Sequence, residues 1–346
     1  MEPKKWKKFF IAFLILIGLL LISGVILFKH YYNLLDVQLK ESSIEFSQNE
    51  VAQSDLQESR SEQQKEGKED FFAGKNISEK AFNIMVVGVD SREVDFEGRT
   101  DAMILVHVNP ETKKIVTTSF LRDMYVDIPG HGGNRLNAAY VFGGPDLLLG
   151  SIKENFGIEI DHYVTLNFWL AIDIFDDLGG VDIEITEQEI EVMNAHMEEH
   201  NRIMNKPQGT DYLSAEDAGM VHLNGNQTLA YARIRYIGTD FARASRQRQI
   251  ISICIDKLKH MNVKEINALL EKYLPTIQTN LTEQDMTTLL FMSLGIHNYS
   301  RESTAIPIYG TWENANIRGM SVLEVDCKAN AEAWYDMISL PQEAEQ

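Results

Sequence analysis

Two short apolar runs joined by a polar loop lie within residues 83–108. They constrain the fold of this chain more than any other feature of its sequence. The run 84–89 is rich in β-branched residues, which favour a buried strand. A second apolar run, 102–108, begins directly after the loop and predicts a second strand. Loops at strand ends bind ligands in open α/β sheets. The charged residues there indicate a site for a metal and an anion, or else a solvated turn with surface ion pairs: Asp90, Arg92, Arg99 and Asp101.

The charge balance is strongly acidic. Among 346 residues, 32 Lys and Arg stand against 51 Asp and Glu, for a formal net charge of −19. Such a field repels nucleic acid, so we expect no nucleic-acid partner. Any phosphate-bearing ligand must be captured by a local group of arginines. The two cysteines, Cys254 and Cys327, have no metal-ligand spacing.

The amino-terminal region predicts a membrane anchor. Four lysines within residues 1–8 precede the uncharged apolar run 9–28, which has the roughly 20 residues that a spanning helix needs. By the positive-inside tendency, residues 1–8 form a cytoplasmic tail and the body lies outside the cell membrane of a single-pass protein. Residues 29–80, rich in Glu, Gln, Ser and Lys, predict an extracytoplasmic stalk. A cleaved signal peptide is the alternative.

The body alternates strand-like and helix-like segments, which indicates an α/β fold. Further strands are predicted at 115–120, 162–166 and 181–185, with an edge strand at 306–309. Helices are predicted at 134–140, 145–156, 168–178, 256–273 and 282–294. The apolar faces of the last two suit an outer helical layer, or the wall of a lipid pocket.

Residues 186–209 depart from this order and are rich in Met, His and Glu. His196 and His200 are four residues apart, a spacing that can hold a metal on one helix face. The strict His-Glu-x-x-His order is missing. A solvated helix is the simpler interpretation.

Five arginines between residues 233 and 248 form the strongest compositional anomaly in so acidic a chain. Arg233 and Arg235 are two apart in a segment predicted to be extended, which would place both on one face. Arg243 and Gln247 would share a helix face. Arginine forks bind phosphate oxygens in bidentate fashion. Ion pairs with nearby acids such as Asp240 are the alternative.

Several segments taken in order resemble the LytR-CpsA-Psr family: GVDSR, RTDAMILV, SFLRDMYVDIPG, NRLNAAYVFGGP, LGGVDI, LNGNQTLAYARIRY and DFARASRQRQ. The resemblance covers about residues 81–255 and extends through the helical region towards 310. It implies an α/β/α sandwich with a central mixed β-sheet and an apolar pocket for a lipid tail. We therefore expect a catalytic domain at 81–320 and a C-terminal tail at 321–346. Leu121 stands where a proline is common in the family, and Ala242 where a glycine is usual.

The same resemblance implies an enzyme of the cell envelope, mainly of Gram-positive bacteria. Such enzymes transfer an anionic glycopolymer, for example teichoic acid or capsular polysaccharide, from an undecaprenyl-pyrophosphate carrier to peptidoglycan. Asp90 and Asp101 match metal-associated positions for Mg²⁺ or Mn²⁺, and Asp90 is alternatively a base. Asp90, Arg122, Arg233 and Arg235 match catalytic positions. The expected pyrophosphate-binding residues are Arg99, Arg122, Arg233, Arg235, Arg243 and Gln247.

Two other functions fit the sequence. A hydrolase would cleave lipid pyrophosphates with water in place of the sugar hydroxyl. A non-catalytic envelope regulator or glycan-binding protein would need no acids at strand ends. A tail of only eight residues before the apolar run is too short for a DNA-binding domain, which counts against direct regulation.

Overall fold

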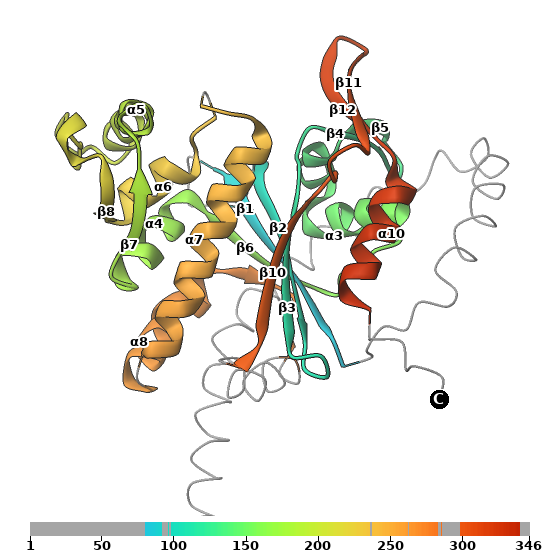
Figure 1. Cartoon of the computed structure of the whole chain (residues 1–346), viewed down its shortest axis with the longest axis horizontal. Helices are drawn as coiled ribbons and strands as arrows, with labels where there is room; N and C mark the ends of the chain where they lie inside the picture. Colours follow the sequence, from blue (N-terminus) through green and yellow to red (C-terminus); the bar gives the residue numbers. More distant parts are fainter. Residues whose placement is uncertain are drawn as a thin grey trace, which may run out of the picture.

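A mixed six-stranded β-sheet forms the centre of the computed structural model (Figure 1), which describes residues 80–91, 96, 98–235, 237–261, 263–282, 285 and 298–339. The strands lie in the order β10-β3-β2-β1-β6-β9. Their bounds are β1 Phe82–Asp90, β2 Arg99–Asn109, β3 Lys114–Phe120, β6 His162–Asn167, β9 Gln278–Thr279 and β10 Ser300–Ile306. Parallel and antiparallel pairs both occur, so the expected central mixed sheet is confirmed.

Strands β1, β3 and β6 end at the same edge of this sheet, as does β10, which is parallel to β3. β2 is antiparallel to both β1 and β3, and β6 is parallel to β1, so β1, β3 and β6 run in one direction. Asp90, Phe120 and Asn167 therefore end their strands together, and β2 begins there at Arg99. This edge is where α/β sheets usually bind their ligands.

One face of the sheet packs against two helices, α3 (Leu136–Phe156) and α10 (Cys327–Ile338). Side chains alternate across a strand, and every second residue of β1 from Met85 to Val89 is fully buried in this core. Trp334 of α10 is 1% exposed and donates from Nε1 to Oγ1 of Thr118, 3.0 Å away. The core thus joins the first strand of the domain to its last helix.

The other face carries α7 (Asp240–His260). Arg248 of α7 donates to Oγ of Ser119 at 2.8 Å and to Oγ of Ser303 at 2.6 Å. Ser119 follows Thr118 in β3 and so points to the opposite side of the sheet. Figure 1 shows the sheet between α7 on one side and α3 with α10 on the other, an α/β/α arrangement.

A second unit lies beside the main sheet. Its antiparallel strands are β7 (Val181–Ile185) and β8 (Gly219–Leu223). The helices around it are α4 Phe168–Asp177, α5 Glu187–Ile203 and α6 Gly225–Ala232, with a 3₁₀ turn at Ala215–Asp217. Helix α8 (Val263–Tyr273) and a 3₁₀ turn at Leu274–Thr276 follow α7 in the chain. A second apolar core joins β7, β8, α5, α6 and part of α7. The described residues therefore form two apolar cores, and α7 contributes side chains to both.

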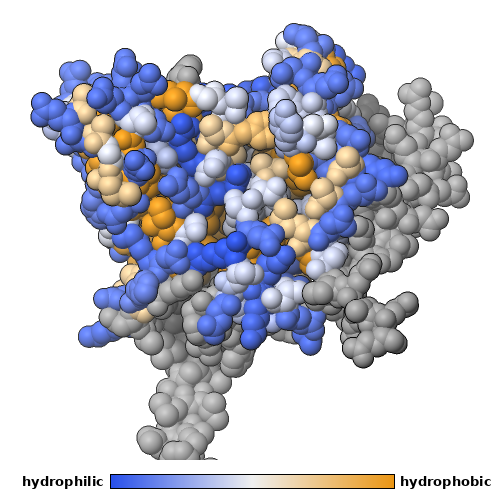
Figure 2. All heavy atoms as spheres, viewed as in Figure 1, coloured by the Kyte–Doolittle hydropathy of each residue, from blue (hydrophilic) through white to orange (hydrophobic). Residues whose placement is uncertain are grey.

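A separate four-stranded sheet has the order β11-β12-β4-β5. Its strands are β4 Met124–Ile128, β5 Gly132–Arg135, β11 Trp312–Ile317 and β12 Met320–Val325. The β11–β12 hairpin projects from the body in Figure 1. It is tied back by the N–H of Leu323, which donates to the carbonyl of Asp123 at 2.9 Å. In Figure 2, the hairpin end and the α5 side of the viewed face are mostly hydrophilic, and hydrophobic residues are visible between them.

Several predicted boundaries need correction. Arg99 and Asp101 lie in β2, because the strand begins three residues earlier than its apolar run. The helix predicted at 256–273 is the end of α7 followed by α8. The edge strand is β10, at 300–306 rather than 306–309. The expected tail at 321–346 begins inside β12 and contains α10, whose Trp334 is buried in the main core.

Other predictions lie outside the described residues. They include the tail at 1–8, the apolar run at 9–28, the stalk at 29–80 except its last residue, and most of the helix predicted at 282–294. Where the structure does describe helices, none combines the length and the apolar character needed to cross a membrane.

Candidate active site at the carboxyl edge of the sheet

A β-bulge at the edge of the sheet displays Asp101. Gly88 pairs with Ala102 and Val89 with Thr100, so Asp101 is the extra residue with no partner on β1. Bulges re-aim side chains and are common beside active sites. A Cβ on Gly88 would meet that of Ala102 at 3.1 Å, tighter than ordinary contact, so glycine suits this crowded crossing. Asp90 lies across from Arg99 at the end of the same strand pair.

Arginines and aspartates alternate through contacts at this edge, and we call these seven residues the ion-pair array. Asp101 Oδ1 is in ion-pair contact with Arg122 and lies 3.9 Å from Arg243. Asp240 Oδ1 lies 3.5 Å from Arg243 and 3.5 Å from Arg235. At the other end, Asp123 lies 3.4 Å from Arg122 and 3.1 Å from Arg135. The array in order is Arg135, Asp123, Arg122, Asp101, Arg243, Asp240 and Arg235.

This array carries a net positive charge, since four guanidiniums alternate with three carboxylates. Its members come from β2, the β3–β4 connection, β5, the segment after α6, and the first turn of α7. Four of the five arginines of residues 233–248 have acidic partners, most of them distant in sequence, and the fifth, Arg248, bonds to two serine hydroxyls. Ion pairing therefore accounts for part of the compositional anomaly, and the excess guanidinium remains for an anion.

Burial acts differently on the two arginines that share Asp101. Although burial lowers the pKa of Arg122, the carboxylates of Asp101 and Asp123 outweigh it and raise that pKa overall. For Arg243, which is 3% exposed, burial dominates and lowers the pKa despite Asp101 and Asp240. A buried guanidinium whose charge is incompletely compensated is a strong partner for an incoming anion.

Arg233 lies at the same edge with partners of its own. Its Cζ is 4.8 Å from the centre of the Phe168 ring, and Phe168 follows Asn167, which pairs with Val89 at the end of β1. Arg233 Nη1 is 2.7 Å from His200 Nε2 and 3.2 Å from Glu199 Oε2. Contrary to the extended segment predicted for residues 233–235, Arg233 caps α6 in a helical conformation, with φ −92° and ψ −8°.

His200 is a fixed hydrogen-bond acceptor for Arg233. A guanidinium only donates, so Nε2 must accept, and Nδ1 carries the proton that it donates to Asn226 Oδ1 at 2.7 Å. Asn226 in turn donates to Asp211 Oδ2 at 2.9 Å. Burial, with Arg233 adding to it, lowers the pKa of His200 to about 4, which keeps the imidazole neutral.

The helix predicted for the segment 186–209 is present and has an exposed side, but His200 is neither solvated nor available to a metal. The segment forms helix α5, whose His200 is 1% exposed rather than solvated. Both ring nitrogens of His200 are engaged by Asn226 and Arg233, which leaves neither for a metal. The helix instead orients an arginine of the site.

The two remaining arginines between residues 233 and 248, Arg246 and Arg248, support the fold. Arg246 is held 3.0 Å from Glu189 of α5 and donates to the carbonyls of Ile234 and Ile237, on either side of Arg235 in the chain. Arg248 ties α7 to β3 and β10, as described above. Gln247 donates to the carbonyl of Ala232 at 3.4 Å, next to Arg233, and so steadies that residue from α7.

The acids at the ends of β1 and β2 fit the donors that Mg²⁺ prefers. Asp90 ends β1 and Asp101 lies in the bulge beside it. Mg²⁺ is commonly held by one or two carboxylates with phosphate oxygens and waters. Among the residues that the structure describes, no group of three or more His, Cys, Asp and Glu side chains is arranged for a metal. Phosphate oxygens of a substrate would therefore have to complete the coordination.

The structure brings together most of the predicted site. Asp101, Arg122, Arg235 and Arg243 belong to the array, and Asp90, Arg99 and Arg233 lie at the same edge of the sheet. Sequence reasoning missed the roles of four residues: Asp123, Arg135, Phe168 and His200. Asp123 and Arg135 lie inside sequence motifs that carry the family resemblance, and these motifs could have pointed to both residues. For Phe168 and His200, only the fold supplies the contact.

Comparison with known proteins finds one family over most of the chain. The LytR_cpsA_psr family model matches residues 45–339. The polyisoprenyl-teichoic acid–peptidoglycan teichoic acid transferase TagU of Oceanobacillus iheyensis is 31% identical over 245 residues, covering 68% of this chain and 69% of that protein. The biofilm regulatory protein A of Streptococcus mutans is 32% identical over 225 residues, covering 60% of this chain and 52% of that protein.

A solved structure has the same fold. The Bacillus subtilis protein TagT with bound octaprenyl pyrophosphate lipid superposes with a TM-score of 0.55 at 23% identity, covering 77% of this chain and 96% of that one. A mixed sheet with guanidiniums and carboxylates at its carboxyl edge defines an α/β protein with a candidate anion-binding site. This chain belongs to the LytR_cpsA_psr family.

Proposed function

We propose that this protein transfers an anionic glycopolymer from an undecaprenyl-pyrophosphate carrier to peptidoglycan. The ion-pair array carries the proposal, because its excess guanidinium charge in a chain of net charge −19 suits a pyrophosphate. The names of relatives such as the transferase TagU support the same reaction. The polymer, teichoic acid or capsule, is a matter for experiment.

The reaction is a phosphoryl transfer between two oxygens. A hydroxyl of the peptidoglycan sugar attacks the phosphorus that carries the glycan, and the bond from that phosphorus to the bridging oxygen breaks. The products are a phosphodiester on peptidoglycan and undecaprenyl phosphate. Arg122, Arg233, Arg235 and Arg243 would stabilise the charge on the leaving phosphate. Asp90 would accept the proton of the attacking hydroxyl or help to bind a metal.

Asp90 and Asp101 would hold Mg²⁺, or Mn²⁺ in its place, and the cation would neutralise phosphate charge when bound. Chelation with EDTA should abolish transfer, and added Mg²⁺ should restore it. Asp90→Asn should weaken binding of Mn²⁺, measured directly by electron paramagnetic resonance. Unchanged Mn²⁺ affinity in that variant would exclude Asp90 as a ligand.

The expected helix at residues 9–28 would anchor the site beside the membrane that contains the lipid carrier. Alkaline extraction of membranes tests this point for the full chain. Release of the intact chain into the soluble fraction would exclude the anchor.

The decisive experiment measures transfer by the full chain in detergent, with a prenyl-pyrophosphate-linked glycan as donor and peptidoglycan as acceptor. Arg122→Ala should lower the rate at least about 100-fold, as expected for loss of a preorganised donor. Arg202→Ala, on the exposed side of α5, is the matched control and should retain the rate. An Arg122→Ala variant that keeps its circular dichroism and its rate would remove Arg122 from the mechanism.

The same assay separates the alternative functions. A hydrolase would release prenyl phosphate equally without peptidoglycan and form no covalent glycan product. A regulator or glycan-binding protein would bind without turnover. The transferase predicts a covalent product that depends on the acceptor.

A further inference from the structure

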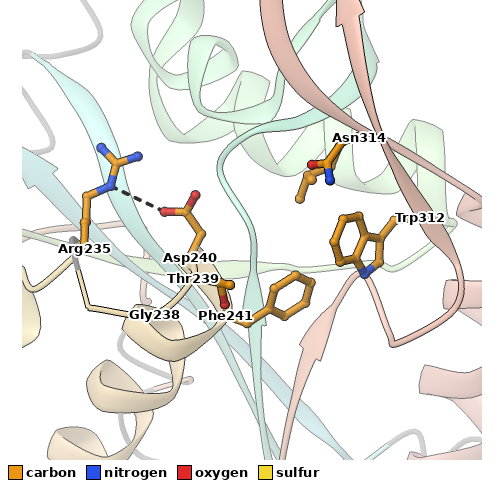
Figure 3. A pocket seen from close by; sticks show the side chains of 8 residues that line it. Arg235, Gly238, Thr239, Asp240, Phe241, Trp312 and Asn314 are labelled. Carbon is orange, nitrogen blue, oxygen red and sulfur yellow. Dashed lines mark ion pairs between the residues drawn. The ribbon is translucent and has the colours of Figure 1, made fainter.

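A pocket lies between the start of α7 and the β11–β12 hairpin, beside the ion-pair array (Figure 3). Its volume of about 520 Å³ falls within the roughly 300–1,000 Å³ of small-molecule sites. The lining residues are Arg235, Gly238, Thr239, Asp240, Phe241, Trp312, Asn314 and Leu323. The mechanism above uses Arg235 but gives no role to the hairpin side of this pocket.

The hairpin presents one ordered face to the pocket. Trp312 and Asn314 are two apart in β11 and so point to the same side, and Leu323 of β12 pairs directly with Asn314. The N–H of Leu323 donates to the carbonyl of Asp123, which adjoins Arg122. This wall is therefore fixed to the same segment that supplies an arginine of the array.

Two aromatic rings form the apolar part of the lining. Phe241 and Trp312 stack with ring centres 5.3 Å apart and planes inclined by 29°. Each is only half-buried, so apolar ring surface remains available to a ligand. In Figure 3 the two rings lie next to each other, with Asn314 above Trp312.

The opposite side of the pocket is polar and charged. Figure 3 shows Arg235 and Asp240 across from the aromatic pair, joined by their ion pair at 3.5 Å. Oδ1 of Asp240 is buried and makes ion pairs with Arg235 and Arg243 but no hydrogen bond. Asp240 thus lies both in the pocket and in the array, and a ligand held by the array has its neighbouring group in the pocket.

We propose that this pocket binds a pyranose ring of the substrate, a refinement that rests on the transferase function proposed above. A sugar ring has apolar C–H faces that pack on aromatic rings, and hydroxyls that exchange hydrogen bonds with Asn, Asp and Arg side chains. A prenyl chain would remove water from the Asp240–Arg235 ion pair and from the amide of Asn314 without offering either a hydrogen bond, which is unfavourable. A second phosphate would face the carboxylate of Asp240.

Two sugars of the reaction have this chemistry. The first sugar of the donor glycan is bonded to the pyrophosphate and must lie next to the arginines that hold it. The acceptor sugar must also approach the same phosphorus. The pocket serves one of them as a specificity site, and binding measurements tell them apart.

The test measures dissociation constants with the full chain in detergent. Three probes are used: octaprenyl pyrophosphate, octaprenyl-pyrophosphoryl N-acetylglucosamine, and a soluble muropeptide. The variants are Trp312→Ala, Trp312→Phe and Asn314→Ala. Tyr309→Ala, which removes a 96% exposed aromatic just before β11 and outside the pocket, is the matched control.

If the pocket binds the donor sugar, Trp312→Ala raises the Kd of the sugar-bearing lipid at least about 10-fold and leaves that of octaprenyl pyrophosphate unchanged. If the pocket binds the acceptor sugar, Trp312→Ala raises the Kd of the muropeptide alone. Trp312→Phe should retain most of the affinity, because a ring remains. Asn314 is exposed, so Asn314→Ala should weaken the same probe without loss of fold.

Unchanged affinities for both sugar-bearing probes in Trp312→Ala and Asn314→Ala would overturn the pocket proposal. Failure of the unaltered chain to bind octaprenyl pyrophosphate is a different result and would contradict the proposed function itself. An equal loss of affinity for octaprenyl pyrophosphate and its sugar-bearing form would also overturn the sugar assignment.

Discussion

At the scale of single residues, the site depends on acids that hold arginines in place before any ligand arrives. Asp101 is shared by Arg122 and Arg243, and Asp240 by Arg243 and Arg235. Each guanidinium thereby loses some conformational freedom in advance, which lowers the entropy that binding would otherwise cost. The carboxylates also neutralise most of the positive charge of the array, and the remaining guanidinium charge is available to a bound anion.

His200 is expected to act through Arg233. Removing its imidazole leaves Arg233 Nη1 without the acceptor at 2.7 Å and Asn226 Oδ1 without its donor. We predict that His200→Ala lowers the transfer rate about 10-fold through loss of orientation. The measurement is a double-mutant cycle with Arg233→Ala. The double variant should be no slower than Arg233→Ala alone, and additive losses would contradict a positioning role.

Two buried histidines should make the protein acid-sensitive. Burial lowers the pKa of His107 and of His200 to about 4, against about 6.5 in an unfolded chain. Between these values the unfolded state binds protons that the folded state does not, so the free energy of unfolding falls as the pH drops from 6.5 to 4. Each histidine contributes up to about 3 kcal/mol of this loss.

Urea unfolding of the full chain across this pH range measures the effect. As the pH drops, the free energy of unfolding of His200→Gln should fall less steeply than that of the unaltered protein. The difference between the two slopes should correspond to the uptake of one proton on unfolding. Identical slopes would mean that His200 is charged in the folded protein at these pH values.

At the scale of elements, short sequence signals decide where the helices begin and bend. Thr186 with Glu189, and Asn224 with Gln227, form the capping boxes that start α5 and α6. These starts place His200 and Arg233 at facing positions. The bend of α3 at Gly143 and Gly144 lies at the break between the two helices predicted at 134–140 and 145–156.

Two glycines of α3 give a matched test of this bend. Gly144 has φ +64° and ψ −158°, a conformation open almost only to glycine, although a Cβ there would meet nothing within 4 Å. We predict that Gly144→Ala destabilises the fold by about 1–3 kcal/mol through backbone strain alone. Gly150 is regular helix with equally open surroundings, so Gly150→Ala should stabilise by about 0.5–1 kcal/mol. Denaturant midpoints of the two variants should move in opposite directions, and a shift of the same sign would refute this reading of α3.

At the scale of the whole molecule, the last elements complete the core and one wall of the pocket. Trp334, Tyr335 and Ile338 of α10 lie in the main core, and β12 extends the sheet of β4. The chain has a net charge of −19, whereas the array has four guanidiniums for three carboxylates. We therefore expect an anionic polymer to be attracted to the array and repelled by the net charge of the chain.

A truncation series tests how much of the C-terminal region the fold requires. A chain ending at residue 319 lacks β12 and α10, and loss of Trp334 alone is expected to remove about 3–5 kcal/mol. That is a large part of a typical stability of about 5–15 kcal/mol, so this chain should fail to fold. A chain ending at Ser339 keeps every described contact and should melt at the Tm of the full chain. Cooperative melting of the shorter chain would contradict the assignment of α10 to the core.

The sequence by itself determined five of the strands (β1, β2, β3, β6 and β7), the α/β class, the family resemblance and most of the charged residues of the site. These follow from local patterns, because apolar periodicity and turn residues act over a few positions. Only the tertiary structure decided that Asp101 sits in a bulge, that His200 of α5 holds Arg233, and that Trp312 faces Phe241. The physical reason is separation along the chain: each contact joins elements whose distance is set by the packing of the sheet and helices, and no local propensity encodes it.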